Sequence, residues 1–363
     1  MLTVLVRNEL EKTWRSRWMV FAVLAGLFLL IAVGLYSYYV YHDHRWSPPP
    51  PVAWQNQLRS DIANNQSNLD NLQTIKQQGG ARGRVLVNAR SLEEAETRLH
   101  QAIAADQYLI NNNIAPLSAF SVTRAALFAL GGIIMFLLVR IFGWLASEQI
   151  AGERSDRTIA ILLSRPPSRD QILVAKAIAS FATSLAVVAA SFLVTYAVVA
   201  FLMGAVGPVT GQVGIPIDGS KPLNPNNLVI MPIFVFVLMC IGGAMLAVLC
   251  VQGMSLLVSV LTGRWAAIGI TLGVLFGASL LSSVVAAVIS LITGSTDSVH
   301  FLNYMFFNVL APVGSIAPVF GNGAGEAGKG MQEFGSEAAT LAVWTVAFFA
   351  SAWFFFRRRE EAG

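Results

Sequence analysis

Residues 230–261 read IMPIFVFVLMCIGGAMLAVLCVQGMSLLVSVL and contain no Asp, Glu, Lys, Arg or His. A helix needs roughly 20 apolar residues to cross the hydrocarbon core of a bilayer, and this stretch is long enough to do so. It holds both cysteines of the chain, Cys240 and Cys250, ten residues apart on one helix where they cannot reach each other. The stretch predicts a transmembrane helix, with no disulfide and no metal site.

Further apolar runs surround it, at 18–41, 119–146, 172–203, 265–293 and 338–356. The chain is 55% hydrophobic and only 12% charged, a composition that argues against a soluble globular domain. We therefore predict an all-α polytopic membrane protein with about six transmembrane helices. The first span is 18–41, and spans two to six lie within 118–363.

The basic residues predict the orientation. Residues 1–17 place Arg7 and Lys12 beside Val4 and Trp14, which is typical of an amphipathic helix on the cytoplasmic leaflet. With a cytoplasmic N-terminus and an even number of spans, 14 of the 24 Lys and Arg residues fall on the inner side. We expect a multi-pass protein of the cell inner (plasma) membrane with both termini cytoplasmic. The same placement explains the net charge of +4 without nucleic acid.

Two segments do not fit simple spans. Residues 42–117 are polar, and their apolar residues recur every three or four positions on either side of a Gly-rich break, which predicts an extracytoplasmic helical hairpin domain open to a further partner. Residues 294–337 are apolar but interrupted by Pro312 and Pro318. We expect a re-entrant helical segment in this outer part, with two extra spans as the alternative.

The loop 147–171 carries the densest charge. Residues 148–176 read EQIAGERSDRTIAILLSRPPSRDQILVAK, in which acids and bases alternate beside an apolar run. Lipid headgroups favour a mostly basic face, so a mixed face is more typical of docking to a soluble protein. The docking residues that we predict are Glu148, Glu153, Arg154, Asp156, Arg157, Thr158 and Arg165.

This stretch resembles the type-2 ABC exporter permeases (ABC-2 type). The shared pattern is an acid, a Gly-Thr-Leu-like step, an apolar helix, then Ser-x-Pro-x-Ser-Arg before a Lys. Here these elements are Glu153, Thr158, Ile159, 160–163, Ser164, Pro166, Ser168, Arg169 and Lys176. Arg157 departs from the family, which usually has glycine there. The amphipathic N-terminus, the six spans and the re-entrant segment extend the resemblance over nearly all of the chain except the hairpin.

The resemblance implies a permease subunit without ATPase activity of its own. Loop 147–171 would be the coupling helix that docks into a separate ATP-binding cassette subunit, with ATP and Mg bound on that partner and no cofactor bound directly. A second permease copy or a related permease would complete the transporter, surrounded by membrane lipid. The cargo would move outward and could be lipid-like, a drug, a peptide or a polysaccharide. The alternative function is a membrane scaffold or sensor with an extracytoplasmic hairpin and a cytoplasmic docking loop.

Other polar and small residues have simpler explanations. Gly269, Gly273 and Gly277 share one helix face and predict close helix packing, either within one subunit or between two copies. We expect Arg140 to reach headgroups near the inner end of its span rather than to contact substrate. Gln252 is expected to make a helix-packing hydrogen bond, with a ligand contact as the alternative. A metal site is not expected, because the His42 and His44 pair has no third ligand at helical spacing.

Overall fold

The computed structural model describes residues 2–15, 26, 54–79, 89–116, 122–123, 126–127, 130, 134–156, 168–202, 211–218, 225–293, 305, 310 and 330–359. Within these residues the chain forms eight α-helices, one short 3₁₀-helix and one three-stranded sheet. The α-helices are α1 (Leu2–Arg15), α3 (Trp54–Gly79), α4 (Ala89–Asn111), α6 (Met135–Ser155), α8 (Arg169–Leu202), α9 (Ile233–Leu261), α10 (Arg264–Thr293) and α12 (Met331–Arg359). The remaining elements are β1 (Ala115–Pro116), β2 (Gln212–Pro216), η3 (Pro225–Asn227) and β3 (Leu228–Pro232).

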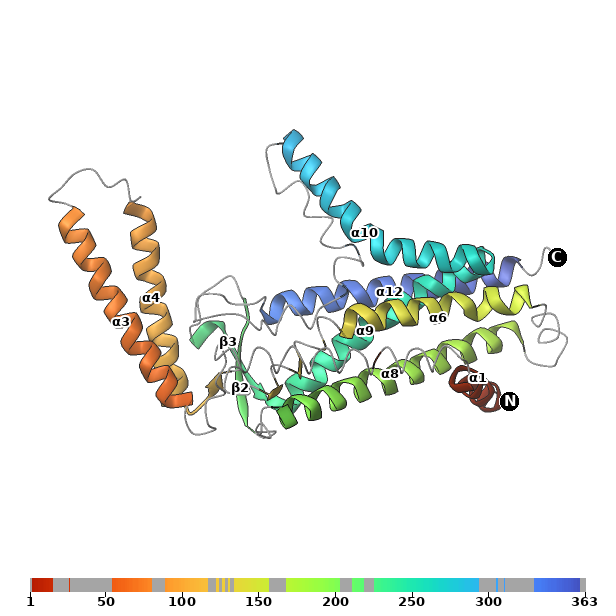
Figure 1. The fold of residues 1–363 in the computed structure, drawn as a ribbon, viewed down its shortest axis with the longest axis horizontal. Helices are drawn as coiled ribbons and strands as arrows, with labels where there is room; N and C mark the ends of the chain where they lie inside the picture. The colour runs from red at the N-terminus through yellow and green to blue at the C-terminus, as the bar shows by residue number, and fades with distance from the viewer. Residues whose placement is uncertain are drawn as a thin grey trace.

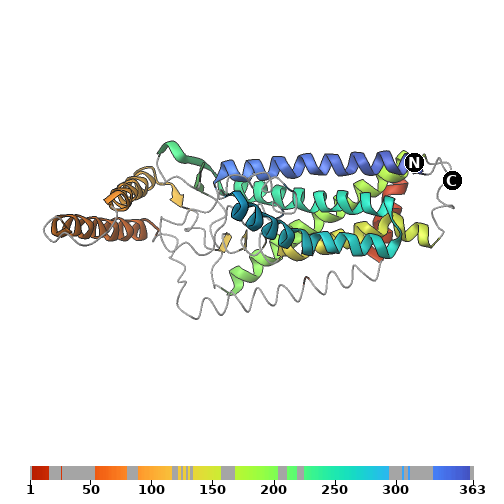
Figure 2. The ribbon, with the colours of Figure 1, turned by 90° about the horizontal axis from the view of Figure 1, so that it is seen from above.

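Helix α9 is the centre of a bundle (Figures 1 and 2), because α6, α8, α10 and α12 all pack against it. A helix that is apolar on every side is stable only where neighbours or lipid cover it. Four described helices are long and apolar enough to cross a bilayer, namely Met135–Ser155, Asp170–Phe201, Ile233–Leu261 and Met331–Arg358. Helix α10 is apolar over Arg264–Gly277. The predicted all-α polytopic fold is confirmed, with a small sheet added to it.

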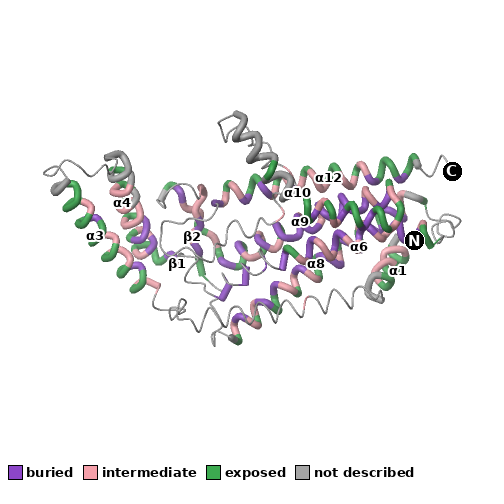
Figure 3. Tube along the Cα trace, turned by 45° about the horizontal axis from the view of Figure 1, so that its top comes forward, coloured by how far each residue is buried: buried purple, intermediate pink, exposed green. Residues whose placement is uncertain are grey.

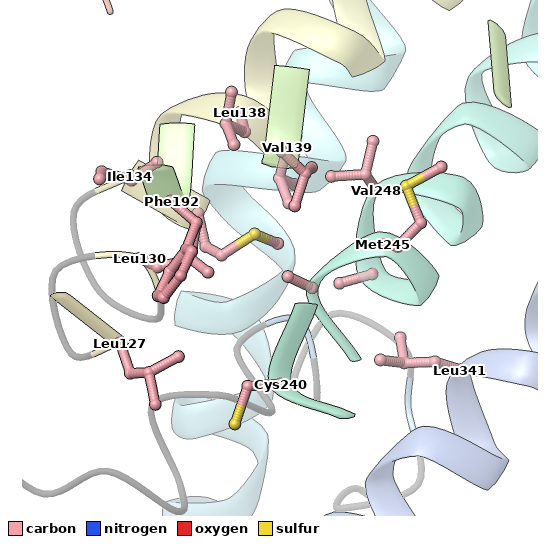
Figure 4. Packing of buried hydrophobic residues seen from close by; sticks show 14 of the residues in the cluster. Leu127, Leu130, Ile134, Leu138, Val139, Phe192, Cys240, Met245, Val248 and Leu341 are labelled. Atoms are coloured by element: carbon pink, nitrogen blue, oxygen red, sulfur yellow. The ribbon is translucent and has the colours of Figure 1, made fainter. Parts of the chain in front are cut away.

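The buried core follows the inner faces of α6, α8 and α9 (Figure 3). Figure 4 shows Val139, Phe192 and Val248 converging there with other apolar side chains. Many large apolar side chains face outward instead, among them Phe201, which is 86% exposed, and Trp265, which is 80% exposed. Exposed apolar surface on this scale is typical of a protein whose solvent is lipid.

The sheet corrects the predicted start of the central span. We predicted a helix from residue 230, but Leu228–Pro232 is a strand and the helix begins at Ile233. Pro232 is the N-cap residue in an extended conformation. Strand β3 pairs antiparallel with β2, and β2 pairs parallel with β1. The sheet lies between the bundle and the α3–α4 pair (Figure 1).

Helices α3 and α4 pack against each other as a hairpin that projects from one end of the bundle, while α1 lies at the other end (Figure 1). Leu58 and Leu109 are buried between the two helices, with Leu228 of β3 against them. Lys76 and Glu96 form an ion pair across the hairpin. The extracytoplasmic location of this hairpin stays a prediction.

Other predicted boundaries differ in detail. Helix α6 continues past Ala146 to Ser155, so the first part of the predicted loop 147–171 is helical, and α8 begins within its last part at Arg169. The last span, predicted at 338–356, is longer, since α12 runs from Met331 to Arg359. Apart from Gly26, the predicted first span, 18–41, lies outside the described residues. Of the predicted re-entrant segment 294–337, residues 331–337 belong to α12 instead, and most of the rest lies outside the described residues.

Candidate functional site

A buried ion cluster joins three helices at the end of the bundle where α1 lies. The ammonium of Lys176, on α8, donates to Glu153 Oε1 on α6 at 2.8 Å and to Glu9 Oε2 on α1 at 3.1 Å. Lys12 of α1 also pairs with Glu153. The side chain of Lys176 is 2% exposed and that of Glu153 is 4% exposed. We call these four residues the Glu153 cluster.

The Glu153 cluster is stable only as a set. Each buried charge loses its hydration at a cost of several kcal/mol, which a close partner of opposite sign offsets. Two acids and two bases balance each other here, so the set carries no net charge. The cluster therefore links α1, α6 and α8 by contacts that are strong while all the partners are present and costly when one is removed.

A second, more exposed set of charges joins α6 to α10. Arg264, the first residue of α10, donates from Nη2 to Glu148 Oε1 at 3.4 Å, and its Nη1 lies 3.6 Å from Asp156 Oδ1. Nearby, Arg154 donates to the carbonyl oxygen of Val260 at 3.2 Å. The Asp156 side chain is 62% exposed. This end of the bundle presents a carboxylate to the surroundings next to a helix end that is held in place.

The last turns of α6 are also fixed by backbone contacts to α9. The backbone amides of Ile150 and Ala151 donate to the hydroxyl of Ser259, at 3.2 and 2.8 Å. Ser259 and both apolar side chains are buried. The charged end of α6 is therefore held by α1, α8, α9 and α10 together.

The predicted docking residues divide into three groups. Asp156 is exposed, and Glu148 and Arg154 are partly exposed and bonded to neighbouring helices. Glu153 does not face outward as the hypothesis of direct docking requires, because Lys176 and Lys12 enclose its carboxylate. Arg157, Thr158 and Arg165 lie outside the described residues and stay predictions. Sequence analysis grouped Lys176 with the family pattern but did not predict its pairing with Glu153.

Arg140 is the remaining charged residue of α6, and its side chain does not extend toward the charged end, as contact with headgroups at that end would require. Its guanidinium donates to the carbonyl oxygen of Phe136, one turn back along α6 and away from the charged end, at 2.5 Å. It also donates to the carbonyl oxygen of Leu275 on α10 at 3.1 Å. The guanidinium carbon lies 3.3 Å from the ring centroid of Phe136 and 4.4 Å from that of Phe276. Arg140 thus turns into the apolar part of the bundle.

The depth of Arg140 follows from helix geometry. Eight residues separate it from Glu148, which is about 12 Å at 1.5 Å per residue. If Glu148, where the charges begin, marks the edge of a hydrocarbon core about 30 Å thick, Arg140 lies well inside that core. Placing an arginine there costs about 2.5–3.5 kcal/mol on insertion scales, and the two carbonyls and two aromatic rings offset part of that cost.

Residues 3–360 match the family described as ABC-2 family transporter proteins. The chain belongs to the ABC-2 transporter family. None of the curated proteins we compared matches it. Members of the family are membrane components of ABC transporters rather than ATPases, and the family implies an ATP-binding cassette partner in general terms. The resemblance that the sequence suggested is confirmed.

In this ABC-2 permease the glycine face of α10 is open. Gly269, Gly273 and Gly277 are exposed, and a Cβ atom added at any of them meets nothing within 4 Å. In the described part of the chain these glycines therefore do not pack against another helix of the same subunit, which was one of the two predicted possibilities. Contact with a second copy stays a prediction. Gln252, in contrast, makes the predicted packing bond, since it donates to Ser184 of α8 at 2.8 Å.

The permease also has an apolar cavity of about 440 Å³ between α8 and α9. Phe192, Tyr196, Ile233 and Val237 are among its lining residues, and Thr123 adds a hydroxyl. Its volume lies within the range of small-molecule sites, and its lining suits an apolar chain. It lies in the half of the bundle away from the Glu153 cluster.

Proposed function

We propose that this chain is the permease subunit of an ATP-driven exporter. A separate ATP-binding cassette subunit, which carries the ATP and Mg, docks at the charged end of α6. Its ATP hydrolysis drives the permease to move cargo outward across the inner (plasma) membrane. Both termini are then cytoplasmic, and a second permease copy or a related permease completes the transporter. Membership of the ABC-2 family and the arrangement of charges at that end support the proposal.

The observation that carries the proposal is the Glu153 cluster. A force applied at the end of α6 reaches α8 through the Lys176–Glu153 pair and reaches α1 through Glu9 and Lys12. Because interfaces of this kind have discrete arrangements, such a force moves the joined helices as a unit. We assign direct docking to the exposed Asp156, with Glu148, Arg154, Arg157, Thr158 and Arg165 as further contacts, and we assign transmission of the movement to Glu153.

Two variants separate docking from transmission. Asp156→Arg reverses an exposed charge, so we expect the tagged chain to lose its ATP-binding subunit when it is purified from native membranes in mild detergent. Glu153→Gln keeps the surface and changes only the buried cluster, so the subunit should remain bound while its ATPase activity stops responding to the permease. Glu93→Arg reverses an exposed acid on the hairpin and is the matched control.

The purification also tests the alternative function. A stoichiometric ATP-binding subunit that co-purifies with the unaltered chain and with the Glu93→Arg variant supports the exporter. A chain that purifies without any ATPase, or whose ATPase is retained and regulated normally in Asp156→Arg, contradicts it. In the first of these cases a membrane scaffold or sensor becomes the better description.

A further inference from the structure

Arg140 has hydrogen-bonding capacity that the protein leaves unused. Its two terminal nitrogens each donate to one backbone carbonyl, those of Phe136 and Leu275, while Nε is buried and has no partner. A guanidinium has five N–H donors in a fixed fork. Within the described residues no carboxylate pairs with it. The positive charge of Arg140 is therefore not neutralised by the part of the chain that the structure describes.

The surroundings of Arg140 are open to the membrane on one side. Arg140 itself is half-buried, and the two rings that flank it are exposed, Phe136 by 49% and Phe276 by 51%. Gly273 and Gly277, on the same stretch of α10, are exposed and present no side chain beyond Cα. Helix α10 lies along the bundle in its first part and turns away from it in its last part (Figure 1). A molecule in the plane of the membrane can therefore reach the half-buried Arg140 side chain and the exposed rings beside it.

We infer that Arg140 binds the negatively charged headgroup of an amphipathic molecule within the membrane, and that the cargo of the exporter is of this chemical class. That the bound molecule is the cargo rests on the proposed function. A phosphate or carboxylate oxygen accepts from the N–H groups of the two terminal nitrogens that the carbonyls leave unused, and it neutralises the charge. This pairing is strongest in a medium of low dielectric constant. The exposed rings of Phe136 and Phe276 lie beside the apolar chain of such a molecule.

The test uses the purified chain reconstituted in phosphatidylcholine vesicles that contain a trace of spin-labelled lipid. Electron paramagnetic resonance gives the fraction of label held at the protein, for phosphatidylglycerol and for phosphatidylcholine in turn. We expect the unaltered chain to prefer phosphatidylglycerol, and Arg140→Gln to lose about tenfold in that preference, as removal of a charge-assisted bond predicts. Arg140→Lys keeps the charge and should keep most of the preference.

The matched control is Arg358→Gln. Arg358 is an exposed arginine whose guanidinium carbon lies 4.2 Å from the ring centroid of Phe354, but it is close to the end of α12. Its replacement should leave the preference unchanged. An equal loss in Arg358→Gln, or an unchanged preference in Arg140→Gln, would overturn the site. Inorganic phosphate added to the vesicles separates the two sources of the anion, because a lipid headgroup site keeps its spin-labelled lipid, whereas displacement by phosphate would contradict a lipid-like ligand.

A second measurement needs no variant. A phosphatidylglycerol with a photoreactive group beside its phosphate should label the unaltered chain within 136–140 and 273–277, and the phosphatidylcholine analogue should not. Labelling confined to the helix ends would contradict the inference. Neither measurement requires the ATP-binding subunit, so their failure overturns the Arg140 site alone, whereas a chain that purifies without an ATPase overturns the exporter.

Discussion

Removal of Lys176 is the sharpest test of the Glu153 cluster. In Lys176→Met the carboxylate of Glu153, which is 4% exposed, loses the ammonium that lies 2.8 Å away. Loss of one partner from a buried pair costs about 3–5 kcal/mol, because an uncompensated charge stays buried. Lys12 remains as a partner of Glu153, and its side chain is 60% exposed, so we expect a loss of free energy of unfolding near the lower end of that range.

The double variant Lys176→Met with Glu153→Gln removes both charges of the pair, so it should recover most of the lost stability. Arg7→Met is the control, since Arg7 and Glu11 form an exposed pair one turn apart on α1, with side chains 80% and 48% exposed. Such pairs contribute about 0.3–0.5 kcal/mol. We therefore expect stability to fall in the order unaltered chain, Arg7→Met, double variant and Lys176→Met.

The assay follows from the two cysteines. Cys240 and Cys250 are buried, so a thiol-reactive fluorescent dye reacts with them only as the solubilised chain unfolds. The melting temperature of Lys176→Met should fall by several degrees. A melting temperature equal to that of Arg7→Met would refute the reasoning, as would a double variant less stable than Lys176→Met.

Three further predictions concern other parts of the molecule. Burial and the charge of Asp61 raise the pKa of the Asp106 carboxyl from 3.8 to about 7, so the folded hairpin binds this proton more tightly than the unfolded chain does, and its stability should fall as the pH rises from about 4 through about 7. Hydrogen exchange of α3 and α4 should show this, with a difference of at most about 4 kcal/mol that Asp106→Asn abolishes. Gly143→Leu should lower the melting temperature more than Gly242→Leu, because a Cβ atom at Gly143 already lies 2.8 Å from Leu275 Cδ1 whereas one at Gly242 meets nothing within 4 Å. If α10 contacts a second copy, Gly273→Cys should form oxidative dimers in native membranes and Gly242→Cys should not.

The fold could be predicted from apolar runs because each span must be apolar over a fixed length, whatever its neighbours are. The strand Leu228–Pro232 could not, since a short apolar run beside a longer one has no periodicity that separates strand from helix. The end of α6 was misplaced for a different reason. Charges begin at Glu148, and a charge usually marks the end of a span, but Arg264 of α10 compensates this one.

The candidate site was predictable only in location. From the sequence, Glu153 is expected to be an acid on the surface. Nothing in the sequence shows that its carboxylate meets the ammonium groups of Lys12, 141 residues away, and Lys176, 23 residues away. The contacts of Arg140 with α10 were equally hidden in the sequence. Helix geometry tilts side chains toward the N-terminus, which is the direction of Phe136, and the carbonyl of Leu275 and the two phenyl rings hold the guanidinium there.

The two charged sites of α6 are coupled by the helix that carries them. Thirteen residues separate Arg140 from Glu153, which is about 20 Å of helix. If α6 tilts as a rigid rod about its contacts with Arg140, a tilt of about 10° displaces its charged end by about 3.5 Å, and the same tilt about the Glu153 cluster displaces Arg140 by that amount. The bond from Arg140 to the Leu275 carbonyl is 3.1 Å long, so a displacement of this size breaks it. A guanidinium released from α10 has a further donor for an anionic headgroup. A tilt of α6 about the Glu153 cluster would therefore change how strongly Arg140 holds the anionic headgroup that we propose for this site.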